Sequence, residues 1–240
     1  MSQLNNLNTG TIPTWCPGCG NFLVLAAIKK AISELKLEPK EVVVTYDIGC
    51  AANMFNNLNV CGFATLHGRS IPVAVGVKMA NPKLTVIAQG GEGGIVTEGG
   101  NHLIHAAQRN DDITVIINNN YVFALTTGQA SAATPKGVKT RSTPEGNPFE
   151  PLLAIDLAAT AGATFLARTL AYDLDKTTEV LKQAIKHRGF SLVEIIQPCI
   201  IWVKEYEDWK RDIKYLKKPF KSIKELIGKK NYLGILYKLD

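Results

Sequence analysis

No apolar run in the sequence approaches the roughly 18 residues that a membrane-spanning helix needs, so the chain is not expected to enter a membrane. The first ten residues lack the charged and then apolar pattern of a secretory signal peptide. We therefore expect a cytoplasmic protein. Internal repeats are also absent, and 240 residues suit one large domain or a domain with a tail.

Acidic residues are scarcer than basic ones: 21 Asp and Glu against 27 Lys and Arg give a net charge of +6. Such an excess suits nucleic acid, anionic cofactors or an acidic protein partner. Outside the C-terminal region the basic residues do not gather on one helix with interleaved aromatics, so nucleic-acid binding is not expected. Cysteine is also sparse. Five cysteines in a reducing compartment favour metal binding or catalysis over disulfides.

The pattern of apolar residues predicts an α/β fold, in which short buried strands alternate with helices. The predicted strands are 42–46, 84–88, 113–117, 164–167 and 192–196. The predicted helices are one built on Leu25, Ile28, Ile32 and Leu35, then 71–80, about 98–109, 151–161 and 174–186, with a long loop at 130–148.

Polar and glycine residues stand directly after two of these strands. Gly90-Gly91-Glu92-Gly93-Gly94 follows strand 84–88, and Asn118-Asn119-Asn120 ends the strand that begins at Ile113. Ligands of open α/β sheets bind beyond the carboxyl ends of the strands, so Glu92 and Asn120 are expected to converge. A carboxylate and a carboxamide oxygen in a glycine-lined crevice suit Mg²⁺ that holds a diphosphate.

Four cysteines lie in loops or just past strand ends. Cys16 and Cys19 form a Cys-x-x-Cys pair, for which zinc, redox and iron–sulfur functions all remain open. Cys50 follows strand 42–46 and Cys199 follows strand 192–196. Four thiolates are the ligand set of a [4Fe–4S] cluster, and zinc accepts the same set. Alternatively, Cys50 and Cys199 are small buried hydrophobic residues. Cys61 is expected to be simply packed.

These motifs, together with Gly99-Gly100-Asn101-His102 and Thr126-Thr127-Gly128-Gln129, resemble the β subunits of the 2-oxoacid:ferredoxin oxidoreductases. The resemblance runs from about Thr14 to Cys199, with a weaker echo at the C-terminus. It implies a three-layer thiamin-diphosphate-binding fold with a mostly parallel sheet and helices on both faces. It also implies oxidative decarboxylation of a small 2-oxoacid, such as pyruvate or 2-oxoglutarate, with coenzyme A as co-substrate and ferredoxin as electron acceptor.

The resemblance assigns roles residue by residue. It implies a [4Fe–4S] cluster on Cys16, Cys19, Cys50 and Cys199, and Mg²⁺ on Glu92, Asn120 and the backbone carbonyl of Val122. The implied thiamin diphosphate contacts are Ile48, Gly49, Cys50, Ala51, His67, Gly68, Arg69, Ser70, Gly93, Gly94, Ala124, Leu125 and Thr126.

Several positions depart from the family pattern. The family has Asp at position 92 and commonly a second Asp at position 94, and its usual Gly-Met is replaced by Ala124-Leu125. The glutamate keeps the charge but reaches one methylene further, and Mg²⁺ demands near-ideal octahedral geometry.

No clear catalytic glutamate is present in the chain. In the family the carboxylate that activates the aminopyrimidine ring comes from the α subunit. The resemblance therefore implies an α partner, with γ and δ subunits as further candidates, and an isolated chain without activity.

The predicted organisation has three parts: a mobile lead-in at 1–13, the thiamin-diphosphate and iron–sulfur domain at 14–200, and a basic, aromatic docking tail at 201–240. In the tail, lysines alternate with aromatic residues, namely Trp202, Tyr206, Trp209, Tyr215 and Phe220.

Three alternatives compete with this interpretation. The four cysteines speak against a thiamin-diphosphate enzyme without a cluster. A nucleotide-dependent dehydrogenase should carry Gly-x-Gly-x-x-Gly after its first strand, where this chain has Asp47-Ile48-Gly49-Cys50. A non-catalytic assembly subunit that binds zinc or an iron–sulfur cluster stays open because of Glu92 and Gly94.

Overall fold

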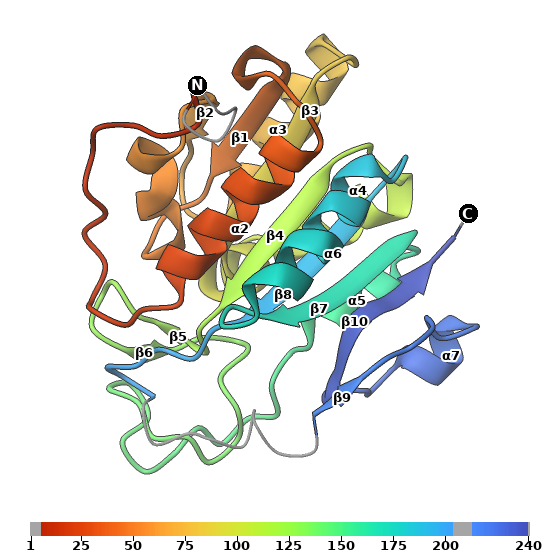
Figure 1. The fold of residues 1–240 in the computed structure, drawn as a ribbon. Coiled ribbons are helices and arrows are strands. Elements are labelled where there is room, and N and C mark those ends of the chain that lie inside the picture. The colour runs from red at the N-terminus through yellow and green to blue at the C-terminus, as the bar shows by residue number, and fades with distance from the viewer. Residues whose placement is uncertain (1–5, 204–212, 240) are drawn as a thin grey trace.

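The protein, described here by a computed structural model for residues 6–203 and 213–239, is built on one eight-stranded sheet between two layers of helices. The strand order is β2-β1-β3-β4-β8-β7-β10-β9. Strands β2 to β7 in this order run parallel, and β10 joins β7 antiparallel. The predicted α/β class, with a mostly parallel sheet, is confirmed (Figure 1).

The main sheet consists of β1 (Val42–Tyr46), β2 (Cys61–Ala64), β3 (Thr85–Gly91), β4 (Thr114–Asn119), β7 (Phe165–Leu170), β8 (Ser191–Ile196), β9 (Lys214–Tyr215) and β10 (Tyr232–Lys238). A separate hairpin pairs β5 (Val122–Phe123) with β6 (Gln129–Ala130). The α-helices are α2 (Asn21–Glu34), α3 (Ser70–Ala80), α4 (Gly100–Arg109), α5 (Ala154–Thr160), α6 (Leu174–Lys186) and α7 (Ile223–Leu226). Short 3-10 helices are η1 (Pro39–Glu41) and η2 (Ala51–Asn57), and η3 (Gly93–Glu98) is a π-helix.

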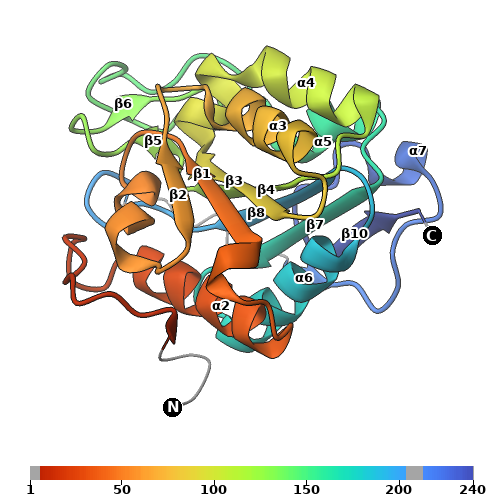
Figure 2. The same ribbon diagram turned by 90° about the horizontal axis from the view of Figure 1, so that it is seen from above.

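Helices cover both faces of the sheet, which is why its central strands are buried along their whole length. Every residue of β1, β4 and β8 is buried, as expected for parallel strands packed on both sides. One core lies under α2 and α6 and contains Ile28 and Leu181. The other lies under α3, α4 and α5 and contains Leu103 and Ile155 (Figure 2).

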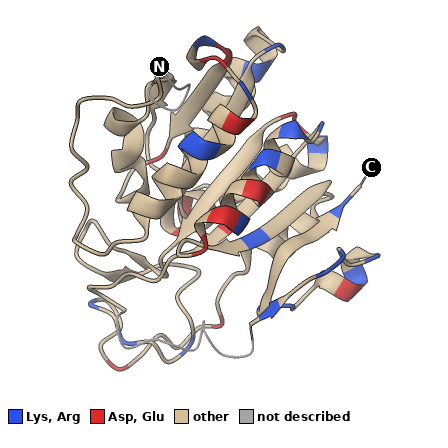
Figure 3. Cartoon of the chain, viewed as in Figure 1, with Lys and Arg blue, Asp and Glu red and all other residues tan. Residues whose placement is uncertain are grey.

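Basic and acidic residues both occur along α2 and α6 (Figure 3). Ion pairs join the two helices, with Lys30 Nζ 2.7 Å from Asp175 Oδ1 and Lys182 Nζ 2.9 Å from Glu34 Oε2. Water screens ion pairs of this kind, so they add little to stability. The apolar core beneath them holds the helices in place.

The C-terminal region requires a correction to the predicted docking tail. Strand β10 pairs with β7 within the main sheet, and Leu226, Leu233 and Leu236 are buried. Leu226 and Leu236 pack in the core under α3, α4 and α5. The described residues 213–239 therefore belong to the fold, whereas Tyr206 and Trp209 lie outside the described residues.

Two smaller expectations also change. The predicted mobile lead-in includes Leu7, which is buried in the core under α2, and Asn8, which forms a β-bridge with Leu58. Cys61, expected to be packed, is exposed on the edge strand β2. Within residues 6–203 and 213–239, no helix has both the length and the apolar composition to cross a membrane.

Candidate functional site

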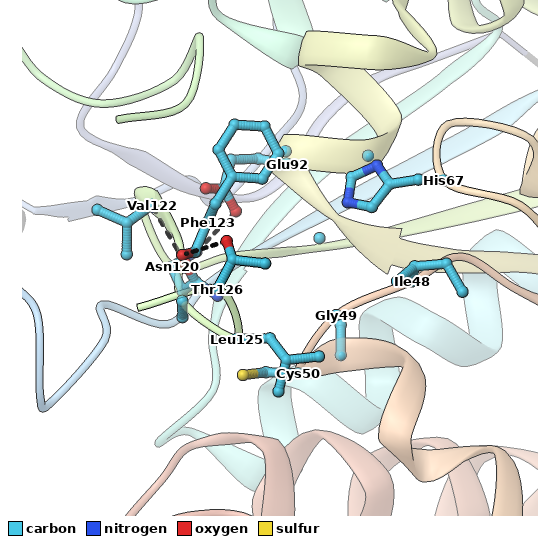
Figure 4. Close-up of a pocket in the computed structure, with 15 residues that line it drawn as sticks. Ile48, Gly49, Cys50, His67, Glu92, Asn120, Val122, Phe123, Leu125 and Thr126 are labelled. Carbon is cyan, nitrogen blue, oxygen red and sulfur yellow. Dashed lines mark hydrogen bonds between the residues drawn. The ribbon is translucent and has the colours of Figure 1, made fainter. Parts of the chain in front are cut away.

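Four neighbouring strands of the sheet deliver the predicted site residues to one edge. The segments that follow β1, β3, β4 and β8 begin at Asp47, Glu92, Asn120 and Gln197, and these strands are adjacent in the order β1-β3-β4-β8. A pocket opens at this edge (Figure 4). It is lined by Ile48, Gly49, Cys50, Ala51, His67, Gly91, Glu92, Gly93, Gly94, Asn120, Val122, Phe123, Ala124, Leu125 and Thr126.

Most of the predicted cofactor and magnesium residues therefore line one pocket, including all three predicted magnesium ligands. Gly68, Arg69 and Ser70 do not line it. Arg69 instead contacts the His102 ring through its guanidinium group. Ser70 is buried at the start of α3, where its carbonyl accepts a hydrogen bond from Thr45 Oγ1 at 2.9 Å.

Glu92 is the buried acid of the pocket, with 1% of its surface exposed. Its Oε2 accepts a hydrogen bond from the Asn120 N–H at 3.1 Å, and its Oε1 accepts one from Ser131 Oγ at 2.9 Å. Burial raises the pKa of Glu92 to about 7, although these hydrogen bonds act in the opposite direction. A buried carboxylate with only neutral partners is favoured in its charged form when a cation lies beside it.

Asn120 is a second polar residue of the pocket, next to Glu92. Its Oδ1 accepts a hydrogen bond from the Val122 N–H at 3.1 Å, forming the local turn typical of asparagine. Figure 4 shows the hydrogen bonds that join Glu92, Asn120 and Val122. A carboxylate, an amide oxygen and a backbone carbonyl are the hard oxygen donors that Mg²⁺ prefers. The side-chain oxygens of Glu92 and Asn120 can each take a further ligand beyond these hydrogen bonds, so these residues would fit a magnesium ion.

The glycines of the loop after β3 are required by their protein neighbours. A Cβ on Gly93 would lie 2.5 Å from the Phe123 ring, and one on Gly94 would lie 1.7 Å from Asp47 Oδ2. Both contacts are far below van der Waals distance, so neither position has room for a side chain. Gly49 is constrained differently, since its φ of +114° is a conformation that favours glycine.

The four predicted cluster cysteines come together beside this pocket. Burial and, to a smaller extent, the nearby Cys19, Cys199 and Cys16 together raise the pKa of the Cys50 thiol to about 11. Burial also raises the pKa of the Cys19 thiol. The Cys19 sulfur accepts a hydrogen bond from Gln197 Nε2 at 3.5 Å.

The spacing of the sulfurs bears on the choice of metal. In the described part of the chain, no three His, Cys, Asp or Glu side chains lie close enough to share one metal ion. A tetrahedral zinc site requires such a group. A [4Fe–4S] cluster instead binds each thiolate to a different iron.

His67 lies at the rim of the pocket, where its ring faces Phe123 with centroids 5.8 Å apart. Its Nδ1 is 3.0 Å from Glu98 Oε2. Asp47 accepts a hydrogen bond from the Gly68 N–H, and Ser131 donates one to Glu92. Neither residue was among the predicted site residues. Asp47 stood at a predicted strand end and was detectable there, whereas Ser131 carries no signal in a loop rich in Ser, Thr and Gly.

Comparison with known proteins identifies the family. Residues 47–195 match the family model described as thiamine pyrophosphate enzyme, C-terminal TPP binding domain. A 2-oxoglutarate synthase subunit KorB from Archaeoglobus fulgidus is 39% identical over 194 residues, which are 80% of this chain and 72% of the relative. The chain belongs to the β subunits of the 2-oxoacid:ferredoxin oxidoreductases.

Other relatives agree with this family. The 2-oxoacid:ferredoxin oxidoreductase subunit beta of Saccharolobus solfataricus is 46% identical over 200 residues, 81% of this β subunit and 66% of the relative. The subunit beta of 2-oxoacid:ferredoxin oxidoreductase 1 from Aeropyrum pernix is 44% identical over 188 residues, and the chain spans 59% of that relative's length. Among solved structures, a 2-oxoglutarate:ferredoxin oxidoreductase from Magnetococcus marinus with 2-oxoglutarate, coenzyme A and succinyl-CoA bound has a TM-score of 0.94. It is 30% identical, and the match covers 99% of this chain and 85% of that chain.

Proposed function

We propose that this β subunit carries out the coenzyme A-dependent oxidative decarboxylation of a 2-oxoacid together with an α subunit. Electrons leave through a [4Fe–4S] cluster to ferredoxin, and the complex works in the cytoplasm. The proposal rests on one observation: the pocket of Glu92 and the predicted cluster ligand Cys199 lie at the same edge of the sheet. The Asn120 carbonyl accepts the Cys199 N–H at 3.2 Å, while the Asn120 side chain belongs to the pocket of Glu92.

In this proposal the residues of the chain bind the metal ion and the cofactor and orient them. Glu92, Asn120 and the Val122 carbonyl hold Mg²⁺ and with it the diphosphate of the cofactor. Thiamin diphosphate, when bound, supplies the electron sink for decarboxylation. Leu125, which lines the pocket and is 52% exposed, presents an apolar surface on which the cofactor rests.

The remaining predicted contacts divide into two groups. Ile48, Gly49, Ala51 and Cys50 line the pocket on the side of β1, and Cys50 also serves the cluster with Cys16, Cys19 and Cys199. His67, Gly93, Gly94, Ala124 and Thr126 line the rest. Gly68, Arg69 and Ser70 follow His67 in the chain, do not line this pocket, and stay predicted contacts.

A test compares the chain alone with the chain co-expressed with an α subunit, using 2-oxoacid, coenzyme A and methyl viologen under anaerobic conditions. Only the complex should reduce the dye, because the activating carboxylate is expected from the α subunit. Turnover by the isolated chain would contradict the shared site.

A second candidate function is a non-catalytic assembly subunit. The observation behind it is that both Glu92 oxygens already accept hydrogen bonds, from Asn120 and Ser131. Anaerobic purification discriminates between the two. A brown protein that retains thiamin diphosphate supports the enzyme, and a colourless protein with zinc and without thiamin diphosphate supports the assembly subunit.

A further inference from the structure

The carboxylate of Asp47 is buried at the tip of β1, with 1% of the residue exposed. Its Oδ1 accepts hydrogen bonds from the Ile48 N–H and the Gly68 N–H, both at 2.8 Å. Its Oδ2 is buried and has no hydrogen-bond partner among the described residues. A buried acceptor without a hydrogen bond lowers the stability of a fold, so other contacts must hold this oxygen in its position.

That position is set by two glycines of the neighbouring strand end. A Cβ on Gly90 would lie 2.7 Å from Asp47 Cβ. A Cβ on Gly94 would lie 1.7 Å from Oδ2 and 2.4 Å from Cγ. The Asp47 carboxylate therefore occupies the volume that any side chain at position 94 would need, and the two exclude each other.

The same carboxylate also holds the turn that carries His67. Gly68 has a φ of +75°, and its N–H reaches Asp47 Oδ1. A Cβ at Gly68 would lie 2.9 Å from Glu98 Cβ, so the turn packs tightly on η3. His67, the preceding residue, lines the pocket and pairs with Glu98. Asp47 thus joins the tip of β1, the glycine loop after β3 and the His67 turn.

We propose that Asp47 is a positioning residue of the thiamin pocket, whose carboxylate fills the space beside Gly94 and fixes the His67–Gly68 turn against the glycine loop. Asp47 does not line the pocket and acts through Gly94 and His67. The proposal deepens the proposed function and rests on it, since the pocket must bind thiamin diphosphate.

The first experiment measures the affinity of the Mg²⁺-loaded full chain for thiamin diphosphate by equilibrium dialysis. D47A should weaken binding about tenfold, the lower end of what residues supporting a site contribute. D47N should stay within about threefold, since it keeps the volume and one acceptor for the Gly68 N–H. Equal affinities of D47A and the unaltered chain would overturn the positioning role. Failure of the unaltered chain to bind thiamin diphosphate in complex with its α subunit would instead contradict the proposed function.

The second experiment tests the shared volume without any ligand, through the midpoint of thermal unfolding. G94A should lower the Tm by about 4 °C or more in the unaltered chain, because Asp47 must give up its hydrogen bonds to admit the methyl group. In the D47A background the same substitution should cost nothing. G76A serves as control, since a Cβ on Gly76 in α3 meets nothing within 4 Å.

A third variant exchanges the residues at positions 47 and 94 and tests whether they share one volume. D47G combined with G94D should unfold at a higher temperature than G94D alone, because the carboxylate then has the volume to itself. Equal losses from G94A with and without Asp47, or an exchange no better than G94D, would refute the pairing. If D47A does not fold, the comparison of D47N with G94A/D47N decides, since the amide introduced by D47N still fills the volume and G94A should remain harmful.

Discussion

Without a cation at the proposed magnesium site, the stability of the chain should depend on pH through Glu92. Without a divalent ion the pKa of this buried carboxyl is raised to about 7 from its ordinary 4.5, chiefly by burial. Between these values the folded chain holds a proton that the unfolded chain has lost. The free energy of unfolding therefore falls as pH rises through this window.

The magnitude follows from the size of the pKa change. A difference of about 2.5 pH units, at about 1.4 kcal/mol per unit, gives a loss of about 3 kcal/mol between pH 4.5 and pH 7. E92Q carries no proton to titrate and keeps an acceptor for the Asn120 N–H. It should remove this loss and leave the rest of the pH profile in place.

The assay is urea unfolding of the metal-free chain at pH 5 and pH 8. The unaltered chain should lose about 3 kcal/mol more than E92Q between these pH values. Mg²⁺ with thiamin diphosphate should shrink the difference, since a cation favours the charged carboxylate. E150Q is the control, because Glu150 is a surface residue paired with Lys136 at 3.0 Å. The same pH dependence in E92Q as in the unaltered chain would show that burial of Glu92 is not its origin.

Three further predictions concern the fold and the cysteines. L236A should cost about 2–5 kcal/mol in urea unfolding because Leu236 is fully buried on β10, whereas L239A, at a half-exposed residue, should be nearly neutral; equal effects would mean that β10 is not packed. R168A should cost about 3–5 kcal/mol by leaving Glu194 buried without its 2.7 Å partner, and replacing both residues by apolar ones should cost less. C61S should retain the full iron content after anaerobic purification, and loss of iron would make Cys61 a ligand.

The convergence of the site residues was predictable from the sequence because it follows from topology. Glu92 and Asn120 each follow a buried strand, and parallel strands end at one edge. The register that pairs Gly91 with Asn118 places the two strand ends side by side. Strand length and the switch from β-branched residues to glycine were therefore sufficient to locate the pocket.

The contacts that support the pocket were not predictable in the same way. Ser131 reaches Glu92 across 39 residues from an irregular loop, and no periodicity marks such a contact. The strand β10 was missed because lysines and aromatics dominate the segment around it. Its pairing with β7 is a long-range contact that local composition does not encode.

Asn120 connects the proposed cofactor pocket with the proposed cluster site through its hydrogen bonds. Its side-chain oxygen accepts the Val122 N–H in the pocket, its own N–H donates to Glu92, and its carbonyl accepts the Cys199 N–H. A shift of the β4 tip therefore moves the acid of the pocket and the last cysteine together. Since hydrogen bonds of this kind hold ligands within tight limits, the end of one strand fixes the separation between the proposed cofactor pocket and the proposed electron carrier.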